Sequence, residues 1–237
     1  MFEPLAVDRR KLFEQIAAHL ERQILKGVLR PGEQFPPERE LQERFGVGRP
    51  AIREALIALQ RAGLVELTNG ARARVAMPTA SGVVAGIAPA IRQMLSTDAG
   101  QRHFQMVRLF FETGLARHAA TVASAADVQR LTQALARNEA AIGNAEAFIE
   151  SDVAFHYVLA EITANPVLIA MHDAMSSWLR EQRLVAIENP GQDRIGYSAH
   201  REIHAAVARH DPDAAEREMR RHLEQVTTVF WENKAAS

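Results

Sequence analysis

The chain has 237 residues, of which 47% are hydrophobic, so it can bury the core of one large domain or of two smaller ones. It contains no cysteine, which excludes a disulfide framework and a thiolate metal site. The sequence has no run of about twenty apolar residues for a membrane span, and its first ten residues lack the apolar stretch of a signal peptide. We therefore expect a cytoplasmic protein with no membrane partner.

The net charge of −1 conceals a difference between two parts of the chain. Up to Met77 there are 13 Lys and Arg against 10 Asp and Glu, a net of +3, whereas the remainder carries a net of −4. A basic front part fits contact with phosphate groups. Because the excess is small, the placement of the arginines matters more than their number.

The first 77 residues predict three helices followed by a hairpin. Over 8–26, one apolar stripe recurs every four residues, at Leu12, Ile16, Leu20 and Ile24. Prolines at the start and glycines at the end delimit two further helices, over 37–45 and 50–62. Alternation over 64–75 flanks Asn69-Gly70, which is a strong hairpin signal. This order predicts a winged helix-turn-helix domain.

Beyond 78–82, which we predict to be a linker, the pattern is helical to the end of the chain. The predicted helices span 83–95, 101–122, 126–142, 147–163, 166–186, 193–209 and 212–232. No alternating run rich in Val, Ile and Thr competes with them. The fold class is therefore mainly α, with a winged helix-turn-helix over 1–77 and an all-α antiparallel helical bundle over 83–237.

Two arginines stand at the beginning of the third predicted helix. Arg49 and Arg53 are four residues apart and share one face, opposite the apolar face. In a helix-turn-helix this end of the second helix reads base edges, and an arginine that bridges a guanine contributes about 1–3 kcal/mol of discrimination. Arg39 could reach the adjacent backbone or a base, and the hairpin tip at Gly70 would approach the minor groove.

The alternative interpretation is that these arginines are solvated surface charges, paired with Glu38, Glu43 and Glu54. For any single arginine this interpretation is the more common one. For the whole constellation, placed on two helices joined by a glycine turn, contact with DNA is favoured.

Residues 9–76 resemble the DNA-binding domain of the GntR family of bacterial transcriptional regulators. The resemblance runs through Pro36-Pro37-Glu38-Arg39-Glu40-Leu41, Phe45-Gly46-Val47 and Arg53-Glu54-Ala55-Leu56. It implies that Arg39, Arg49 and Arg53 contact double-stranded operator DNA and that Gly70 lies at the tip of the wing. Family members often have hydroxyl residues at the positions of Gly48 and Pro50, so backbone amides could bind phosphate here instead.

A possible metal site lies in the second half of the chain. Asp152 and His156 are four residues apart and share one face of a predicted helix, while His200 and His222 lie on later helices. The spacing alone leaves alternatives open. An Asp-His pair of this kind is more often a surface ion pair, and His204, four residues after His200, forms a rival pair.

Residues 100–231 resemble the effector-binding domain of the FadR subfamily, which is called the FCD domain. The resemblance implies that Asp152, His156, His200 and His222 hold a divalent metal inside the bundle. Three imidazoles and a carboxylate suit zinc, with nickel or manganese as substitutes. Family members often carry Glu at the position of Ala199, but all four implied ligands are present.

The same resemblance implies where an effector binds. Arg108 matches a position that faces the effector pocket, and its guanidinium could pair with a carboxylate; the alternative is a salt bridge to Glu112. Asn165 belongs to the same motif and is a second candidate effector contact. Further strings, such as Asn69-Gly70-Ala71-Arg72, are similar to family members that regulate sialic-acid catabolism, which implies a sugar-acid effector such as N-acetylneuraminate.

The sequence therefore predicts a DNA-binding transcriptional regulator that is not an enzyme. We expect a homodimeric repressor whose operator affinity is controlled by a small carboxylate or sugar-acid effector bound beside the metal. Two alternatives use the same residues differently. One is a metal-dependent hydrolase-like enzyme that activates water, for which no general base is evident; the other is a regulator with a purely structural metal.

Overall fold

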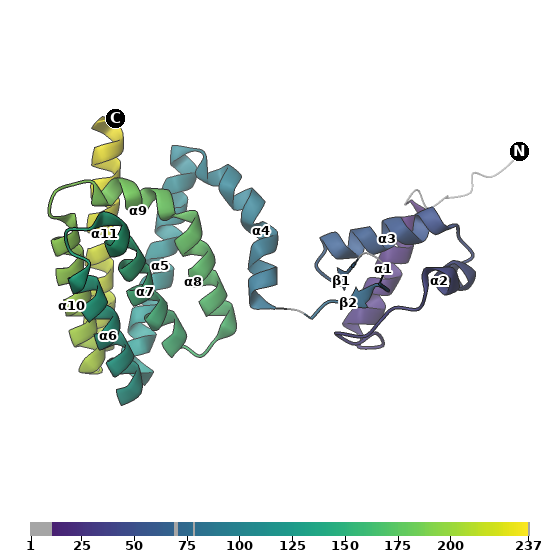
Figure 1. The fold of residues 1–237 in the computed structure, drawn as a ribbon, viewed down its shortest axis with the longest axis horizontal. Helices are drawn as coiled ribbons and strands as arrows, with labels where there is room; N and C mark the ends of the chain where they lie inside the picture. Colours follow the sequence, from purple (N-terminus) through teal and green to yellow (C-terminus); the bar gives the residue numbers. More distant parts are fainter. Residues whose placement is uncertain (1–10, 69–70, 78, 237) are drawn as a thin grey trace, which may run out of the picture. The chain divides into compact units, whose positions relative to one another are not determined.

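The computed structural model describes residues 11–68, 71–77 and 79–236, and it is mainly α-helical over these ranges (Figure 1). The chain divides into two compact units, Met1–Gly86 and Ile87–Ser237. Helix α4 (Ala80–Leu95) crosses from the first unit into the second. Among the described residues, no helix is both long enough and apolar enough to span a membrane.

The first unit contains the three predicted helices. They are α1 (Leu12–Leu25), α2 (Glu38–Phe45) and α3 (Arg49–Arg61). Gly46 ends α2 with a φ of 64°, in the left-handed region that glycine adopts at little cost, and thereby allows the tight turn into α3. The amphipathic faces of α1 and α3 pack against each other around Ile16, Leu20 and Ile52, which are buried.

The hairpin of the first unit is short. Strands β1 (Val65–Glu66) and β2 (Arg74–Val75) are antiparallel, with Val65 opposite Val75, and both of these valines are buried. The amide of Phe35 donates to the carbonyl of Ala73, which ties the segment before α2 to the hairpin. The turn predicted at Asn69-Gly70 lies outside the described residues.

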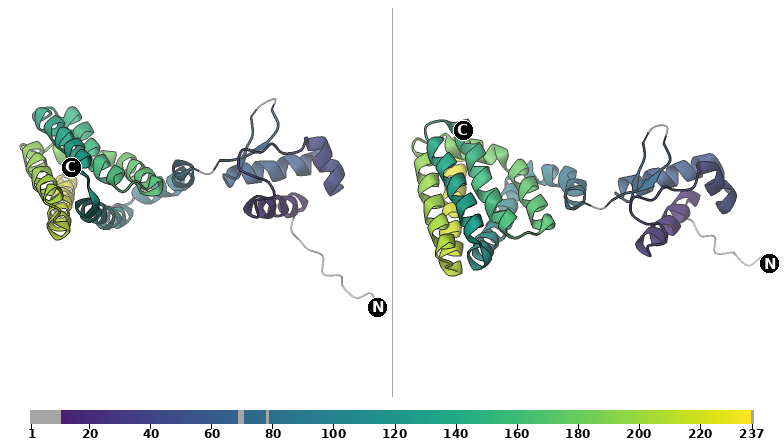
Figure 2. Two further views of the ribbon diagram at one scale, coloured as in Figure 1. Left: turned by 90° about the horizontal axis from the view of Figure 1, so that it is seen from below. Right: turned by 60° about the horizontal axis from the view of Figure 1, so that its bottom comes forward.

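The second unit is a bundle of helices that lie side by side (Figure 2). Its helices after α4 are α5 (Asp98–Val122), α6 (Ala125–Ala140), α7 (Ala145–Ile162), α8 (Pro166–Trp178), α9 (Arg180–Ile187), α10 (Gln192–Ala208) and α11 (Pro212–Ala236). Helix α11 packs along α5 and α10, and α6 packs along α7 and α10. The predicted all-α bundle is confirmed.

Side-chain caps explain several of the helix starts. Ser124 and Asp127 form a reciprocal capping box at α6, and the side-chain oxygens of Thr97, Asn144 and Asn165 accept first-turn amides of α5, α7 and α8. Because each cap satisfies an amide that the helix itself leaves unpaired, the short polar residues between the apolar stripes determine where the helices begin.

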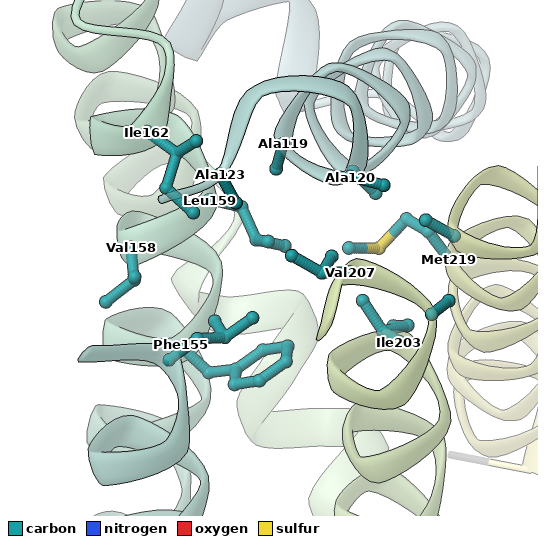
Figure 3. Packing of buried hydrophobic residues seen from close by; sticks show 14 of the residues in the cluster. Ala119, Ala120, Ala123, Phe155, Val158, Leu159, Ile162, Ile203, Val207 and Met219 are labelled. Carbon is teal, nitrogen blue, oxygen red and sulfur yellow. The ribbon is translucent and has the colours of Figure 1, made fainter. Parts of the chain in front are cut away.

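The core of the bundle is built from small and aliphatic side chains. Figure 3 shows Ala119 and Ala120 of α5 facing Val207 of α10 and Met219 of α11. Alanines on α5 let the neighbouring helices approach closely, and Phe155 of α7 fills the space beside Ile203. The ring of Phe155 stacks on that of His200 at a centroid distance of 4.4 Å, so this core continues directly into a buried group of polar residues.

Two predicted helix boundaries differ from those in the structure. The segment 166–186, predicted as one helix, is divided into α8 and α9 at Leu179, whose φ of −100° and ψ of 13° lie outside the α-helical values. Leu179 is fully buried, so its tertiary packing outweighs the local helical pattern. Helix α4 begins at Ala80, within the segment predicted as a linker.

Candidate DNA-reading surface and metal centre

The arginines predicted to contact DNA are exposed around α3. Arg49 and Arg53 line one hollow of about 470 Å³ together with Arg72, between the beginning of α3 and the hairpin. Arg39 of α2 is 90% exposed and does not line this hollow. Gly70, predicted at the wing tip, lies outside the described residues. The structure thus brings Arg49 and Arg53 together, with Arg72 of the hairpin beside them.

Two of these arginines pair with nearby carboxylates, as the alternative interpretation expected. Arg49 Nε donates to Glu38 Oε2 at 2.9 Å, and Arg39 Nε donates to Glu43 Oε1 at 3.1 Å. Exposed ion pairs of this kind contribute about 0–1 kcal/mol, so exchanging them for phosphate or base contacts costs little. The pairs orient the guanidinium groups without preventing contact with DNA.

The N-terminus of α3 has no side-chain cap. Gly48 is its N-cap, in extended conformation with φ −72° and ψ 157°, and no side chain accepts a hydrogen bond from the first turn. Amides at such a helix end attract anions, because the helix dipole and the unpaired N–H groups act together. Pro50 has no N–H and the Ala51 amide donates to the Gly48 carbonyl, so the Arg49 amide is the one left in this turn to take the place of the expected hydroxyls.

In the second unit, four residues from three helices form a buried cluster. Asp152 and His156 lie on α7, His200 on α10 and His222 on α11, and one ligand atom from each lies within 4.8 Å of the others. Asp152 Oδ1 lies 3.3 Å from His200 Nε2 and 4.0 Å from His156 Nε2. The four residues predicted from the sequence are therefore brought together, and they could bind a metal ion.

The protonation of two of these histidines follows from their outer contacts. His200 Nδ1 lies 2.9 Å from Asn138 Oδ1, and Asn138 Nδ2 donates to Ser151 Oγ at 3.0 Å. Because the Ser151 hydroxyl donates to the carbonyl of Phe148, its oxygen must accept from the amide, which orients Asn138. The Asn138 oxygen then accepts from His200 Nδ1, so the lone pair of His200 is on Nε2, facing the cluster.

His156 is held in the same way by a carboxylate. Its Nδ1 lies against Glu112 Oε2 of α5, and an ionised carboxylate can only accept. Burial would raise the pKa of Glu112, but the Arg108 guanidinium, followed by His156, holds this pKa well below its usual value. Glu112 is thus ionised, and the lone pair of His156 is on Nε2. Metal-binding histidines characteristically donate their other ring nitrogen to a carboxylate or an amide oxygen in this way.

The buried nitrogens facing the cluster have no hydrogen-bond partner among the described residues. They are Nε2 of His156, Nε2 of His200, and both ring nitrogens of His222. Unpaired buried polar atoms are costly, and a shared metal ion would satisfy one nitrogen of each ring. Burial lowers the pKa of His222 and of His200, which keeps both imidazoles neutral, as metal binding requires.

The fourth group of the cluster is anionic. Burial would raise the pKa of Asp152, but its close contact with His200 and the neighbouring His156 and Arg183 lower it strongly. The residues present therefore fit a divalent metal, because they supply one carboxylate and three imidazoles as donors.

Arg108, predicted as an effector contact, lies beside this cluster. It lines a cavity of about 40 Å³ with Asp152, Arg183 and His222, which we call the inner cavity. Its Nε donates to Glu112 Oε1 at 2.6 Å, so the salt bridge considered as an alternative is present as well. Both side chains are buried, and their pairing offsets the cost of burying each charge.

Asn165 and His204 lie elsewhere. Asn165 is the exposed N-cap of α8, where its Oδ1 accepts from the amide of Val167 at 2.9 Å, and it lines neither the inner cavity nor the metal cluster. Asn165 therefore serves as a helix cap in this structure, and its contact with an effector stays a prediction. His204 Nε2 lies 2.8 Å from Thr132 Oγ1 and is not one of the four cluster residues.

Three buried polar residues at the site were not predicted as parts of it. They are Glu112, Asn138 and Arg183. Arg183 of α9 has its Nε 3.3 Å from Asp152 Oδ2, and its Nη1 donates to the carbonyl of Ser176 at 3.0 Å. Burial lowers the pKa of Arg183 to about 10, which still leaves it charged near neutral pH. The sequence contained a signal for Glu112 alone: it lies four residues after Arg108, which is the spacing of a helical salt bridge.

A larger cavity lies between α7, α8 and α9. It has a volume of about 660 Å³, and we call it the outer cavity. Ile149 and Arg183 line both cavities and so form the wall between them. Volumes of 300–1,000 Å³ are typical of small-molecule sites, so the outer cavity is large enough for an organic ligand, whereas the inner cavity has room only for an ion and a few water molecules.

Comparison with known proteins assigns both units to families. Residues 12–75 match the family described as bacterial regulatory proteins, gntR family, and residues 104–225 match the FCD domain. The chain is 42% identical over 229 residues to the HTH-type transcriptional repressor NanR of Enterobacter sp. (strain 638), covering 96% of this chain and 87% of the relative. The match to the NanR repressor of Escherichia coli (strain K12) has the same identity of 42% over 229 residues, and it covers 96% of this chain and 86% of that protein.

Solved structures show the same fold. A GntR protein of Streptococcus agalactiae matches with a TM-score of 0.59 at 24% identity, covering 91% of this chain and 99% of that one. The E. coli protein McbR/YncC matches with a TM-score of 0.54 at 17% identity, covering 95% and 99%. Because the family consists of transcriptional regulators, the predicted absence of enzymatic activity is confirmed and the hydrolase-like alternative is rejected. The chain belongs to the GntR family of bacterial transcriptional regulators and carries an FCD domain as its ligand-binding domain.

Proposed function

We propose that this protein is a repressor whose operator affinity is lowered when a small carboxylate, such as a sugar acid, binds beside a divalent metal in the FCD domain. The observation that carries the proposal is the buried cluster of Asp152, His156, His200 and His222 beside two buried arginines. A protein that works on chromosomal operator DNA acts in the cytoplasm.

The charges around the inner cavity favour an anionic effector. Arg108 and Arg183 are balanced there by Glu112 and Asp152. A divalent ion would add positive charge that no further buried carboxylate of the cluster offsets, and uncompensated buried charge is strongly unfavourable. A carboxylate ligand would supply the missing negative charge, and an arginine fork pairs with it bidentately.

Zinc is the proposed metal, with nickel and manganese as substitutes, because the donor set combines three imidazoles with one carboxylate. When bound, the metal supplies a fixed positive charge and an attachment point for a carboxylate oxygen. N-acetylneuraminate is the effector that we propose to test first, because the sequence strings noted above are similar to those of regulators of sialic-acid catabolism.

The proposed unit of function is a homodimer that binds two half-sites of an operator. Met106, Val107 and Phe110 of α5 are 50–65% exposed and form an apolar surface on a long helix. Phe110 lies about 200° around the helix axis from Arg108, so α5 carries the effector side and this apolar surface on opposite faces. We propose that a second copy of the chain covers Phe110 and its neighbours.

Fluorescence anisotropy tests the proposed switch. The DNA is a labelled duplex carrying a binding site selected from a random library. We expect saturating N-acetylneuraminate to lower the DNA affinity of the zinc-loaded protein by roughly 5–150-fold, the usual range of coupling between two sites. His222→Ala should abolish this response, whereas His204→Ala, outside the cluster, should retain it. An unchanged DNA affinity with every carboxylate tested would contradict the proposal.

Removing the zinc from the same protein distinguishes a metal that takes part in effector sensing from a purely structural metal. If removing zinc with a chelator lowers the melting temperature but leaves the effector affinity unchanged, the metal is structural. We expect both the melting temperature and the effector affinity to fall, because the effector carboxylate and the imidazoles would bind the same metal.

A further inference from the structure

The inner cavity is too small for the effector that the metal cluster is proposed to sense. Its volume of about 40 Å³ accommodates an ion with a few water molecules. A sugar acid has a ring and several hydroxyl groups in addition to its carboxylate, so most of such a molecule must lie elsewhere. The outer cavity of about 660 Å³ is the adjoining space of sufficient size.

Arg183 is the partition between the two spaces. Its side chain is 5% exposed and lines both cavities. One nitrogen of its fork donates to the carbonyl of Ser176, whereas Nε lies 3.3 Å from Asp152 Oδ2 without the alignment of a hydrogen bond. A buried guanidinium with an unsatisfied donor, between an ion-sized space and a ligand-sized space, is suited to receive a carboxylate.

The remaining lining of the outer cavity has a different chemistry. Glu146, Glu150 and Asp173 contribute carboxylates, and Ser176 and Ser177 contribute hydroxyls. These groups accept hydrogen bonds from hydroxyl and amide N–H groups of a ligand. The carboxylates also repel a second negative charge at the far end of the ligand, although Arg180 partly offsets them. The lining therefore selects a ligand with one charged end and an uncharged polar body.

We propose that the outer cavity binds the uncharged, hydroxyl-bearing body of a monocarboxylate effector, whose carboxylate is received by Arg183 at the wall of the inner cavity. This proposal rests on the proposed function, in which the effector is a carboxylate. It adds where the body of the effector lies, which side chain connects the two cavities, and why sugar diacids are rejected.

Filling the outer cavity tests where the body binds. Isothermal titration calorimetry on the full-length, zinc-loaded protein would compare N-acetylneuraminate and galacturonate with glycolate, a carboxylate with almost no body. We expect Ser177→Trp, at an exposed position of α8 that lines the outer cavity, to weaken binding of the sugar acids by at least about tenfold through a steric clash. Zinc content and glycolate affinity should not change.

Val167→Trp is the matched control, because Val167 is an exposed residue of α8 that lines neither cavity. A second variant tests the charge selection. Wild-type protein should bind galacturonate more tightly than galactarate, its diacid counterpart, and the double variant Glu150→Gln, Asp173→Asn should narrow this difference by several-fold because it removes two negative charges.

The outcomes separate the two proposals. If Ser177→Trp binds sugar acids as tightly as the wild type, or if wild-type protein binds only glycolate, the outer-cavity site is wrong while a carboxylate effector stands. If Val167→Trp causes the same loss as Ser177→Trp, the site is also wrong. If no carboxylate binds the zinc-loaded wild type, the proposed function fails, and the outer-cavity site fails with it.

Discussion

At the scale of single residues, the candidate metal centre depends on side chains that do not themselves reach the cluster. Asn138 is fully buried, and its amide is held by Ser151 so that its oxygen faces His200 Nδ1. Glu112 does the same for His156. These contacts decide which ring nitrogen carries the proton, and therefore which nitrogen is available to a metal.

Removing the amide of Asn138 should weaken metal binding without disturbing the four ligands. We expect Asn138→Ala to lower zinc affinity by about 10–100-fold, the usual cost of losing such an orienting partner, as measured by competition with a chromogenic chelator. Nitrogen-15 NMR of His200 should show mixed tautomers in the metal-free variant and one tautomer in the wild type. Thr132→Ala, which removes a contact to His204 from the same helix, is the control. Equal zinc affinity in wild type and Asn138→Ala would show that the amide has no orienting role.

His172 is a fourth buried histidine among the described residues; it lies outside the cluster and affects how stability depends on pH. Burial lowers its pKa from 6.5 to about 4. The unfolded chain therefore binds this proton more readily, and the contribution of neutral His172 to stability is lost as the pH falls from about 6.5 towards about 4. We expect His172→Leu to remove about 1 kcal/mol of the stability loss between about pH 7 and about pH 5.5. Urea denaturation with excess zinc measures the free energy of unfolding at each pH, and His118→Leu, at an exposed position, is the control. If the free energy of unfolding of His172→Leu depended on pH as steeply as that of the wild type, the prediction would be contradicted.

At the scale of elements, α3 is the candidate reading helix because its two faces differ. Ile52, Leu56 and Leu59 are buried against the domain core, and Arg49 and Arg53 line the exposed hollow beside the hairpin. In its uncapped first turn Pro50 has no N–H and the Ala51 amide donates to the Gly48 carbonyl, so the Arg49 amide is the one that can face phosphate. The helix therefore combines a structural face with a polar face, which is the arrangement that groove binding requires.

Loss of Arg53 should weaken operator binding by about 1–3 kcal/mol if it contacts a base. Anisotropy titrations against the selected operator and against variants of each base pair would show reduced discrimination at one position. A uniform loss across all sequences, with a shallower salt dependence, would assign Arg53 to phosphate instead. Arg61→Ala, at the other end of the same helix, is the control. DNA affinity equal to wild type in Arg53→Ala would remove it from the interface.

At the scale of the whole molecule, we propose that dimer formation links effector binding in the FCD domain to the binding of two operator half-sites. The apolar surface around Phe110 lies on the face of α5 opposite Arg108. No element of the described part of the chain covers it, and Phe110 is 65% exposed. A charged residue there should oppose burial between two copies, because an unpaired charge in an apolar interface is costly.

We expect Phe110→Glu to shift the protein from dimer to monomer in sedimentation velocity runs at micromolar concentration. Operator affinity should fall with it, because each half-site would be bound separately. Val122→Glu introduces the same charge at an exposed apolar position near the end of α5, and it should leave the dimer intact. A wild type that sediments as a monomer, or a Phe110→Glu variant that remains a dimer, would contradict the assignment of this surface.

Local pattern was sufficient to predict the elements. Apolar spacing, capping residues, and prolines and glycines at helix ends indicated the helices and the hairpin, because these signals act over a few neighbouring residues. The division of 166–186 into α8 and α9 was not predicted, since it depends on the burial of Leu179 among distant residues. Arg183 was missed for the same reason: its position against Asp152 exists only because the chain turns at Leu179.

The sequence by itself determined the class of the protein: a basic helix-turn-helix with a hairpin, followed by an all-α domain in which an aspartate and three histidines match a family motif. Only the tertiary structure decided which polar residues meet. It buried Glu112, Asn138 and Arg183 beside that cluster, placed Asn165 away from it, and separated an ion-sized cavity from a ligand-sized one. The physical reason is that helix formation depends on neighbours in the chain, whereas burial, proton placement and cavity size depend on packing between helices far apart in sequence.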